Sequence, residues 1–214
     1  MIAVIDYGAG NVGSVIKATE YLGFPAERAE TGRSLREAAK IILPGQGHFG
    51  AMMRALEGRK MVEPLREALR DGKPFLGICL GLQMLYERSE EAPDVFGLGI
   101  LAGRVKRLEG VFKVPHVGWS QLEIQRKSSI LRGVAQGSFV YYCHSYYGPV
   151  TAESSAITEY GQRFAAVAES ENVYAVQFHP EKSGDVGLQI LRNFLEGRNE
   201  KSEVRKQSGG QGQV

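Results

Sequence analysis

The sequence predicts an α/β fold with a mostly parallel central sheet, helices on both of its faces and antiparallel strands added at its edge. In the first half, short apolar runs alternate with amphipathic stretches, which is the pattern of parallel strands covered on both faces. In the second half, strand-like runs follow one another with few helices between them, which favours antiparallel pairing. Hydrophobic residues make up 43% of the 214 residues, so the chain can bury one substantial core.

The expected strands of the first half are apolar runs bounded by turn residues, at positions 2–6, 26–29, 40–43 and 74–79. The expected helices have apolar residues three or four positions apart, at positions 12–22, 50–56, 61–70 and 80–88. Gly23 follows the first of these stretches, and glycine commonly ends a helix.

The second half begins with strand-like segments, expected at positions 103–108, 138–145, 164–169 and 173–178. An amphipathic helix at 186–195 closes the fold. We expect residues 1–196 to form a single domain. Residues 197–214 are polar and offer almost nothing to bury, so a disordered tail is expected there.

Composition excludes several classes of function. The formal net charge of +2 and the absence of a Lys/Arg block argue against nucleic-acid binding. The apolar runs are far too short to span a membrane, and the N-terminus lacks the features of a signal peptide. The two cysteines, Cys79 and Cys143, do not form a disulfide framework, which predicts a reducing, cytoplasmic location.

A candidate nucleophile lies where an expected strand meets an expected helix, in Gly-Ile-Cys-Leu-Gly at residues 77–81. The nucleophile elbow of hydrolases has this form, with flanking glycines that permit a sharp, strained turn. A helix N-terminus at Cys79 would favour the thiolate, and the Leu80 N–H could donate to an oxyanion. The alternative is a buried, inert cysteine. Cys143 lacks the glycine frame and is expected to be a small strand residue.

The candidate base is His179, which ends an apolar strand and is followed by Pro180 and Glu181. In an extended segment, His179 and Glu181 point the same way, so the carboxylate can fix the imidazole tautomer. The alternative is a strand-end histidine beside a surface glutamate. The other histidines, His48, His116 and His144, are expected to be structural or to line a binding site. No pair of His or Cys residues has metal-ligand spacing.

Three motifs resemble those of the class I (triad) glutamine amidotransferases. They are Pro-Gly-Gln-Gly at 44–47, Gly-Ile-Cys-Leu-Gly-Leu-Gln at 77–83 and Gln-Phe-His-Pro-Glu at 177–181. The resemblance implies a flavodoxin-like fold and no cofactor. It also implies that L-glutamine is hydrolysed to glutamate and ammonia through a γ-glutamyl thioester on Cys79, with His179 and Glu181 completing the triad.

The same resemblance assigns roles to further residues. Gly47 and Leu80 would supply the N–H groups of an oxyanion hole. The side chains of Gln83 and Glu91 would hold the substrate's α-amino-acid end. Backbone groups of Ser145 and Tyr146 would also contact the substrate. The sequence departs from the family pattern at Gln46 and His48, where small or apolar residues are expected.

Segments at 6–11, 115–119, 142–146 and 181–184 resemble one branch of this family, the glutaminase subunits of imidazole glycerol phosphate synthase. That resemblance implies a heterodimer with a HisF-type (β/α)₈ cyclase, which receives the ammonia. The products would be imidazole glycerol phosphate and an aminoimidazole carboxamide nucleotide (AICAR), in histidine biosynthesis. Asn11 and Trp119 are expected at or near the partner interface.

Three alternatives remain at this stage. Residues 8–13 form a G-x-G-x-x-G motif after a strand, with Glu30 about 20 residues on, as in Rossmann nucleotide-binding proteins. The extra length of the turn and the lack of a second βαβ unit oppose this interpretation. A glutaminase subunit of another biosynthetic amidotransferase would share the chemistry but not the partner. A redox sensor built on Cys79 would need no partner carboxylate at Glu181.

Overall fold

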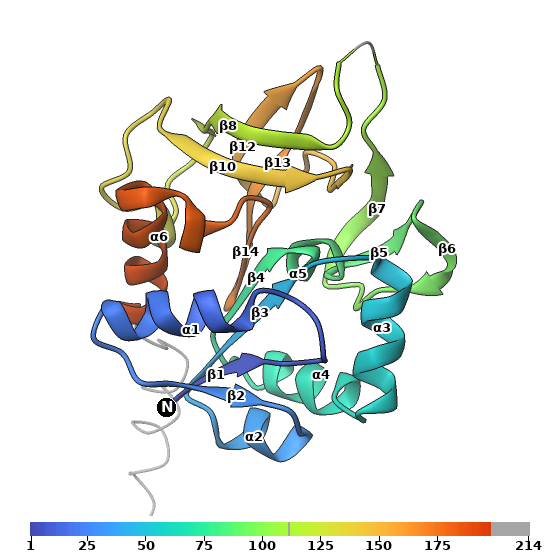
Figure 1. Cartoon of the computed structure of the whole chain (residues 1–214), viewed down its shortest axis with the longest axis vertical. Coiled ribbons are helices and arrows are strands. Elements are labelled where there is room, and N and C mark those ends of the chain that lie inside the picture. Colours follow the sequence, from blue (N-terminus) through green and yellow to red (C-terminus); the bar gives the residue numbers. More distant parts are fainter. Residues whose placement is uncertain (111, 198–214) are drawn as a thin grey trace, which may run out of the picture.

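The computed structural model describes residues 1–110 and 112–197. Within this part of the chain, the largest sheet has eight strands in the order β2-β1-β3-β4-β14-β13-β12-β9 (Figure 1). The first five strands in this order, β2, β1, β3, β4 and β14, are parallel to one another. The last three, β13, β12 and β9, are joined to this sheet by antiparallel pairing. The predicted arrangement, a mostly parallel sheet with antiparallel additions at its edge, is confirmed.

The parallel part consists of short buried strands, as the apolar runs predicted. Their bounds are β1 (Ile2–Ile5), β2 (Ala26–Ala29), β3 (Lys40–Gly45), β4 (Phe75–Cys79) and β14 (Val173–Val176). The antiparallel part is formed by β13 (Gln162–Ser170), β12 (Ser154–Tyr160) and β9 (Glu123–Ile124).

Helices cover both faces of this sheet (Figure 1). Successive side chains of β1 point to opposite faces, so Ile2 and Val4 belong to one core while Ala3 and Ile5 belong to the other. The first core is shared with α1 (Val12–Tyr21) and α6 (Gly184–Glu196). The second is shared with α2 (Gly32–Glu37), α3 (Phe49–Gly58) and α4 (Val62–Arg70).

Two smaller sheets stand beside the main one. The first is a ribbon of two antiparallel strands, β8 (His116–Gln121) and β10 (Phe139–His144). The second is formed by β5 (Tyr86–Ser89), β6 (Ala92–Phe96), β7 (Leu101–Arg107) and β11 (Tyr146–Tyr147). Two short 3₁₀ turns, Ser129–Leu131 and Pro180–Lys182, complete the described elements.

One expected helix is wrong. The stretch at 80–88 is helical only over α5 (Leu80–Gln83), and the chain then enters β5. The next residues, Met84 and Leu85, are both fully buried, so no polar helix face exists there. Their carbonyl groups accept hydrogen bonds from Leu98 and Ile100, which draws the chain into the small sheet.

Helix α2 was not predicted from the sequence. It is short, and Thr31 caps it by accepting a hydrogen bond from the Ser34 N–H at 3.3 Å. The expected disordered tail at 197–214 lies outside the described residues, apart from Gly197. Among the described residues, no helix is long and apolar enough to cross a membrane.

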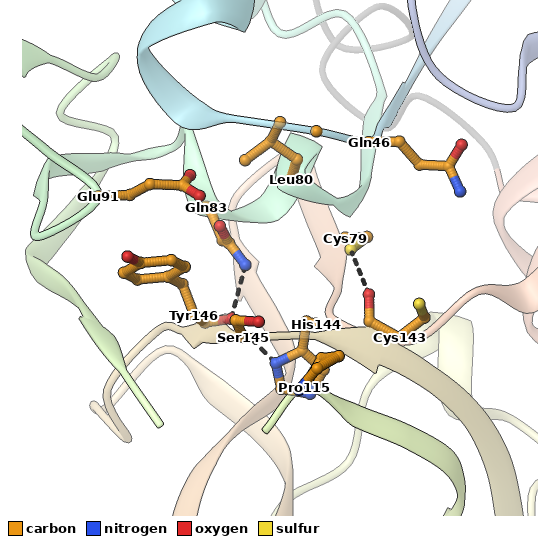
Figure 2. Close-up of a pocket in the computed structure, with 11 residues that line it drawn as sticks. Gln46, Cys79, Leu80, Gln83, Glu91, Pro115, Cys143, His144, Ser145 and Tyr146 are labelled. Carbon is orange, nitrogen blue, oxygen red and sulfur yellow. Dashed lines mark hydrogen bonds between the residues drawn. The ribbon is translucent and has the colours of Figure 1, made fainter. Parts of the chain in front are cut away.

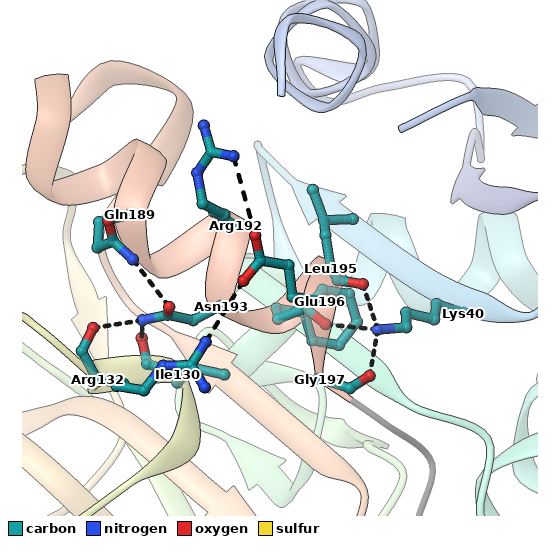
Figure 3. Close-up of polar contacts among 10 residues, drawn as sticks. Lys40, Ile130, Arg132, Gln189, Arg192, Asn193, Leu195, Glu196 and Gly197 are labelled. Carbon is teal, nitrogen blue, oxygen red and sulfur yellow. Dashed lines mark hydrogen bonds and ion pairs between the residues drawn. The ribbon is translucent and has the colours of Figure 1, made fainter. Parts of the chain in front are cut away.

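The end of α6 is fastened to the central sheet by Lys40 (Figure 3). The Lys40 Nζ donates to the carbonyl oxygens of Phe194, Leu195 and Gly197, at 2.7, 2.6 and 2.6 Å. The last carbonyl groups of a helix have no partner within the helix, and a cation there also opposes the negative end of the helix dipole. Lys40, which is far from α6 in the sequence, therefore caps the C-terminal end of this helix.

Replacing Lys40 by methionine should destabilise the fold. Met keeps the length of the side chain but leaves three carbonyl groups without their donor, which predicts a loss of about 1–3 kcal/mol in the free energy of unfolding. Urea unfolding followed by circular dichroism measures this loss. Lys17→Met, at an exposed position of α1, is the matched control and should change stability by less than about 0.5 kcal/mol. Equal effects in the two variants would contradict the capping role.

Candidate active site

The turn from β4 into α5 holds Cys79 in a strained conformation. Its φ of 55° and ψ of −107° lie in a region that side chains other than glycine rarely adopt. A Cβ atom on Gly81 would collide with the Leu43 carbonyl oxygen of β3, and one on Gly77 would collide with the backbone of Gly81. Glycine is therefore required at both positions. This is the geometry of a nucleophile elbow.

The helix that follows Cys79 is a single turn of four residues. It is shorter than the sequence predicted, so its dipole contributes little to the stability of a thiolate. The remaining influence of this helix is local and comes from the N–H groups of its single turn, which begins at Leu80.

His179 and Glu181 lie together next to this elbow. The His179 Nδ1 is 3.0 Å from the Glu181 Oε1, and their side chains are only 3% and 1% exposed. Pro180 begins a 3₁₀ turn rather than an extended segment, so the conformation expected around this residue was wrong although the pairing was right. The chain is fixed here because the His179 N–H donates to the Tyr141 carbonyl oxygen of β10 at 2.9 Å.

The electrostatics of His179 are set by two opposing effects. Burial alone would lower the pKa of His179, but the neighbouring Cys79 and Glu181 outweigh it and raise that pKa well above its usual range. Within the described residues, the buried His179 Nε2 makes no hydrogen bond to the protein. One nitrogen of the imidazole is thus committed to Glu181, and the neighbouring charges favour the protonated ring.

A cavity of about 380 Å³ opens at Cys79 (Figure 2). It brings together all six residues to which the sequence assigned oxyanion or substrate roles: Gly47, Leu80, Gln83, Glu91, Ser145 and Tyr146. The rest of the lining comes from Gln46, Cys79, Pro115, Cys143 and His144. His179 and Glu181 are not among the residues that line the cavity, but His179 is a neighbour of Cys79, which does line it.

Two residues of the segment at 44–47, Gln46 and Gly47, line the cavity. Gln46 is clamped by Tyr7, whose hydroxyl accepts from the Gln46 N–H and donates to the Gln46 carbonyl oxygen, both at 3.1 Å. Tyr7 was not identified from the sequence, because only the fold brings the end of β1 to β3. Gly47 has a φ of 95°, and the Gln46 and His48 side chains are exposed. The His48 Nδ1 caps α3 by accepting from the Gly50 N–H at 3.1 Å.

Several substrate-site candidates are held by the protein itself. The Glu91 Oε2 accepts a hydrogen bond from the Phe49 N–H at 2.6 Å, at the start of α3. The Ser145 carbonyl oxygen accepts from the Leu108 N–H at 2.8 Å. These contacts fix the positions of both groups at the edge of the cavity.

A second residue missed from the sequence is Gln177, which follows β14 and is fully buried. Its Nε2 donates to the Cys79 Sγ at 3.6 Å, and its Oε1 accepts from the Gln83 Nε2 at 3.2 Å. Gln83 also donates to the Tyr146 carbonyl oxygen at 2.7 Å. The motif that contains Gln177 was recognised, but only the strand register shows that its side chain reaches the sulfur.

The expectation that His116 and His144 are structural residues or walls of the site fits their surroundings. Burial lowers the pKa of His116 to about 4 and that of His144 to about 3, so both are neutral at physiological pH. The rings are linked by a hydrogen bond of 3.2 Å between His116 Nδ1 and His144 Nε2. His116 also stacks on Tyr142 and Tyr160.

The two residues expected at a partner interface lie in different settings. Trp119 is 54% exposed on the β8–β10 ribbon. Asn11 is half-buried, and its Nδ2 donates to the Glu181 Oε1 at 3.3 Å instead of capping α1. The structure therefore connects Asn11 to the catalytic candidates, which the sequence did not predict.

Local structure explains two of the three glycines in the motif at 8–13. Gly8 and Gly10 have φ values of 94° and 97°, and a Cβ on Gly10 would press on the Pro44 carbonyl oxygen. The Asp6 carboxylate accepts from the Gly8 N–H at 2.9 Å and pairs with Arg28 at 2.6 Å. The tight turn accounts for both glycines without a bound nucleotide.

Comparison with known proteins gives a consistent result. The family model described as glutamine amidotransferase class-I matches residues 3–197. The imidazole glycerol phosphate synthase subunit HisH of Bacillus cereus (strain B4264) is 45% identical over 195 residues, covering 91% of this chain and 93% of the relative. The HisH subunit of Methanothermobacter thermautotrophicus is 48% identical over 197 residues, covering 92% and 98%.

Solved structures resemble the chain in fold. A crystal structure described as a glutamine amidotransferase superposes with a TM-score of 0.72 at 18% identity, covering 92% of this chain and 98% of that one. The structure of PurLQS from Thermotoga maritima gives a TM-score of 0.66 at 19% identity, covering 91% and 96%.

The raised pKa of His179 can be measured by NMR titration of histidine side chains. In the wild-type chain, His179 should remain protonated past neutral pH. Glu181→Gln and Cys79→Ala each remove one group that raises the pKa, so His179 should lose its proton at lower pH in both variants. His116 and His144 serve as internal references, since they should stay neutral throughout. Titration of the wild-type His179 near 6.5, its ordinary value, would contradict the raised pKa.

Proposed function

The chain belongs to the class-I glutamine amidotransferases, and we propose that it is the glutaminase subunit of an imidazole glycerol phosphate synthase in histidine biosynthesis. It hydrolyses L-glutamine to glutamate and ammonia with Cys79, His179 and Glu181. The observation that carries this proposal is the buried His179–Glu181 pair beside a cysteine held at φ 55° in a glycine-framed elbow.

In the first half-reaction, the Cys79 thiolate attacks the carboxamide carbon of glutamine. The tetrahedral oxyanion is stabilised by the Leu80 N–H and by a backbone N–H near Gly47. His179 then donates its proton to the departing nitrogen, and ammonia leaves as the γ-glutamyl thioester forms. The raised pKa of His179 supports this step, because the imidazole still carries its proton at neutral pH.

In the second half-reaction, the deprotonated His179 takes a proton from water as the water attacks the thioester carbon. The carbon–sulfur bond breaks, glutamate is released and the thiolate–imidazolium pair is restored. Glu181 keeps one ring nitrogen protonated and stabilises the cation each time it forms.

The substrate's α-amino-acid end lies at the far side of the cavity from Cys79. Glu91 is an anion suited to the substrate ammonium, and Gln83 lies one helical turn beyond the nucleophile. The backbone at Ser145 and Tyr146 completes this end of the site. Because Glu91 is already fixed by the Phe49 N–H, its carboxylate is preorganised for the ammonium.

The β8–β10 ribbon is the proposed docking surface for a HisF-type (β/α)₈ cyclase. Its outer face exposes the apolar side chains of Val117, Trp119 and Phe139, at 54%, 54% and 51%. An exposed apolar cluster of this kind favours a protein partner. The end of β10 also supplies Cys143 and His144 to the cavity wall, so a partner on the ribbon would lie next to the site of ammonia release.

The partner subunit receives the ammonia that the glutaminase releases. Free ammonia is mostly protonated at neutral pH and is then no nucleophile, so direct transfer to the cyclase preserves its reactivity. There the ammonia is incorporated into a ribulosyl phosphate nucleotide, with imidazole glycerol phosphate and AICAR as products. The free thiols of Cys79 and Cys143 suit a reducing cytoplasm, which is the proposed location.

The function is tested by purifying the chain alone and with the cyclase, and measuring glutamate release. We expect low activity alone and a rate at least tenfold higher when the partner is loaded with its acceptor. Cys79→Ala should abolish glutamate release, while ammonium salts should still support synthesis by the mutant complex because assembly is intact. Equal rates with and without the loaded partner would refute the coupling, and activity in Cys79→Ala would refute the nucleophile.

The docking surface is tested by Trp119→Ala. Truncation of an aromatic anchor at the centre of an interface costs about 2 kcal/mol or more, so the dissociation constant for the cyclase should rise by about 30-fold. Isothermal titration calorimetry measures this change. Tyr21→Ala, at a position that is 78% exposed on α1, is the control and should bind as the wild type does. Unchanged binding by Trp119→Ala would remove the ribbon from the interface.

A further inference from the structure

We propose that Gln177 stabilises the Cys79 thiolate through a direct hydrogen bond, and that Gln83 fixes the orientation in which it does so. This inference rests on the proposed role of Cys79 as nucleophile. Gln177 then acts on the reacting atom itself, while Gln83 links the nucleophile to the part of the cavity assigned to the substrate's α-amino-acid end.

The strand register places Gln177 beside the sulfur. Strand β14 pairs parallel with β4, with Val176 opposite Ile78. One further step in the same register puts Gln177 opposite Cys79, at the carboxyl edge of the sheet. The resulting 3.6 Å contact between the Gln177 Nε2 and the Cys79 Sγ is therefore a consequence of sheet pairing rather than of a mobile loop.

The direction of the hydrogen bonds follows from one backbone carbonyl group. The Tyr146 carbonyl oxygen can only accept, so the Gln83 atom that meets it at 2.7 Å must be the donor Nε2. The same Nε2 has a second hydrogen, which goes to the Gln177 Oε1 at 3.2 Å. The Gln177 Nε2 must then face Cys79, and its N–H donates to the sulfur. Figure 2 shows the Gln83 nitrogen directed toward Tyr146, with its oxygen on the opposite side.

The histidine pair anchors the same carbonyl group from the other side. The His144 Nδ1 donates to the Tyr146 carbonyl oxygen at 2.9 Å, which leaves the Nε2 of a neutral ring as an acceptor for His116. The His116 Nε2 in turn accepts from the Ser120 hydroxyl at 2.9 Å. Since both imidazoles stay neutral at physiological pH, this polarity does not reverse there.

An N–H donor favours the charged form of the atom that accepts from it. The Gln177 amide N–H, directed at the Cys79 sulfur, therefore favours the thiolate over the thiol. The hydrogen bond also holds the sulfur in one position in the cavity. Loss of Gln83 would leave Gln177 free to turn its amide, so the effect on the thiol should extend, more weakly, to that position.

The test is the pH dependence of Cys79 alkylation by iodoacetamide, followed by mass spectrometry on the isolated full-length chain. In Gln177→Glu the donor to sulfur is replaced by an oxygen, and the rate at pH 7 should fall about tenfold, with the half-maximal pH displaced upward. Gln177→Met, which removes the donor without adding charge, should give about a threefold to tenfold decrease. Gln83→Met should give a smaller displacement in the same direction.

The titratable groups next to the thiol, His179 with Glu181 behind it and Tyr7, are unchanged in every variant. Gln189→Glu in α6 is the matched control and should keep the wild-type profile. Alkylation requires neither glutamine nor a partner, so its outcome is independent of glutamate release. A wild-type profile in both Gln177 variants, or the same displacement in Gln189→Glu, would overturn the proposal.

Discussion

The site depends on one steric constraint, the passage of the β4–α5 turn against β3. The backbone at Gly81 lies so close to the Leu43 carbonyl group that any side chain at this position would collide with it. Cys79, two residues before Gly81, has a positive φ, and the parallel strands on both sides of β4 hold the turn in place. The strain at Cys79 persists because the buried central strands hold the turn, which is the usual condition for strained residues at functional sites.

The second half of the chain brings the remaining groups to this turn. Strand β14 lies beside β4 although the two are separated by most of the antiparallel segment, and their parallel register delivers Gln177 and His179 to the edge where Cys79 lies. The ribbon β8–β10 then closes over this edge, since the Tyr141 carbonyl group accepts from the His179 N–H. The parallel half therefore supplies the proposed nucleophile, and the later half supplies the proposed base and the exposed surface.

The sequence alone predicted what periodicity and short motifs encode. Alternating apolar runs predicted the parallel strands, and the two flanking glycines predicted Cys79 as the candidate nucleophile. It failed where a residue's role depends on a distant neighbour. The stretch after Gln83 was read as helix because its pairing with β7 cannot be seen locally, and Met84 and Leu85 are buried on all sides. Tyr7 and Gln177 were missed for the same reason, since their partners, Gln46 and Cys79, are set by strand order and register.

Burial lowers the pKa of the buried histidines in this site, and neighbouring charge reverses that shift only at His179. His144 and His179 are 5% and 2% exposed, so desolvation lowers the pKa of both. For His144 the polar neighbours are a neutral carbonyl group and another imidazole, which cannot offset the cost of burying a cation. For His179 the neighbours are Cys79, in its thiolate form, and the Glu181 carboxylate, and together they reverse the sign of the shift. Cys79 and Glu181 beside His179, with no anion among the groups that shift the pKa of His144, therefore separate the proposed proton carrier from a structural hydrogen-bond donor.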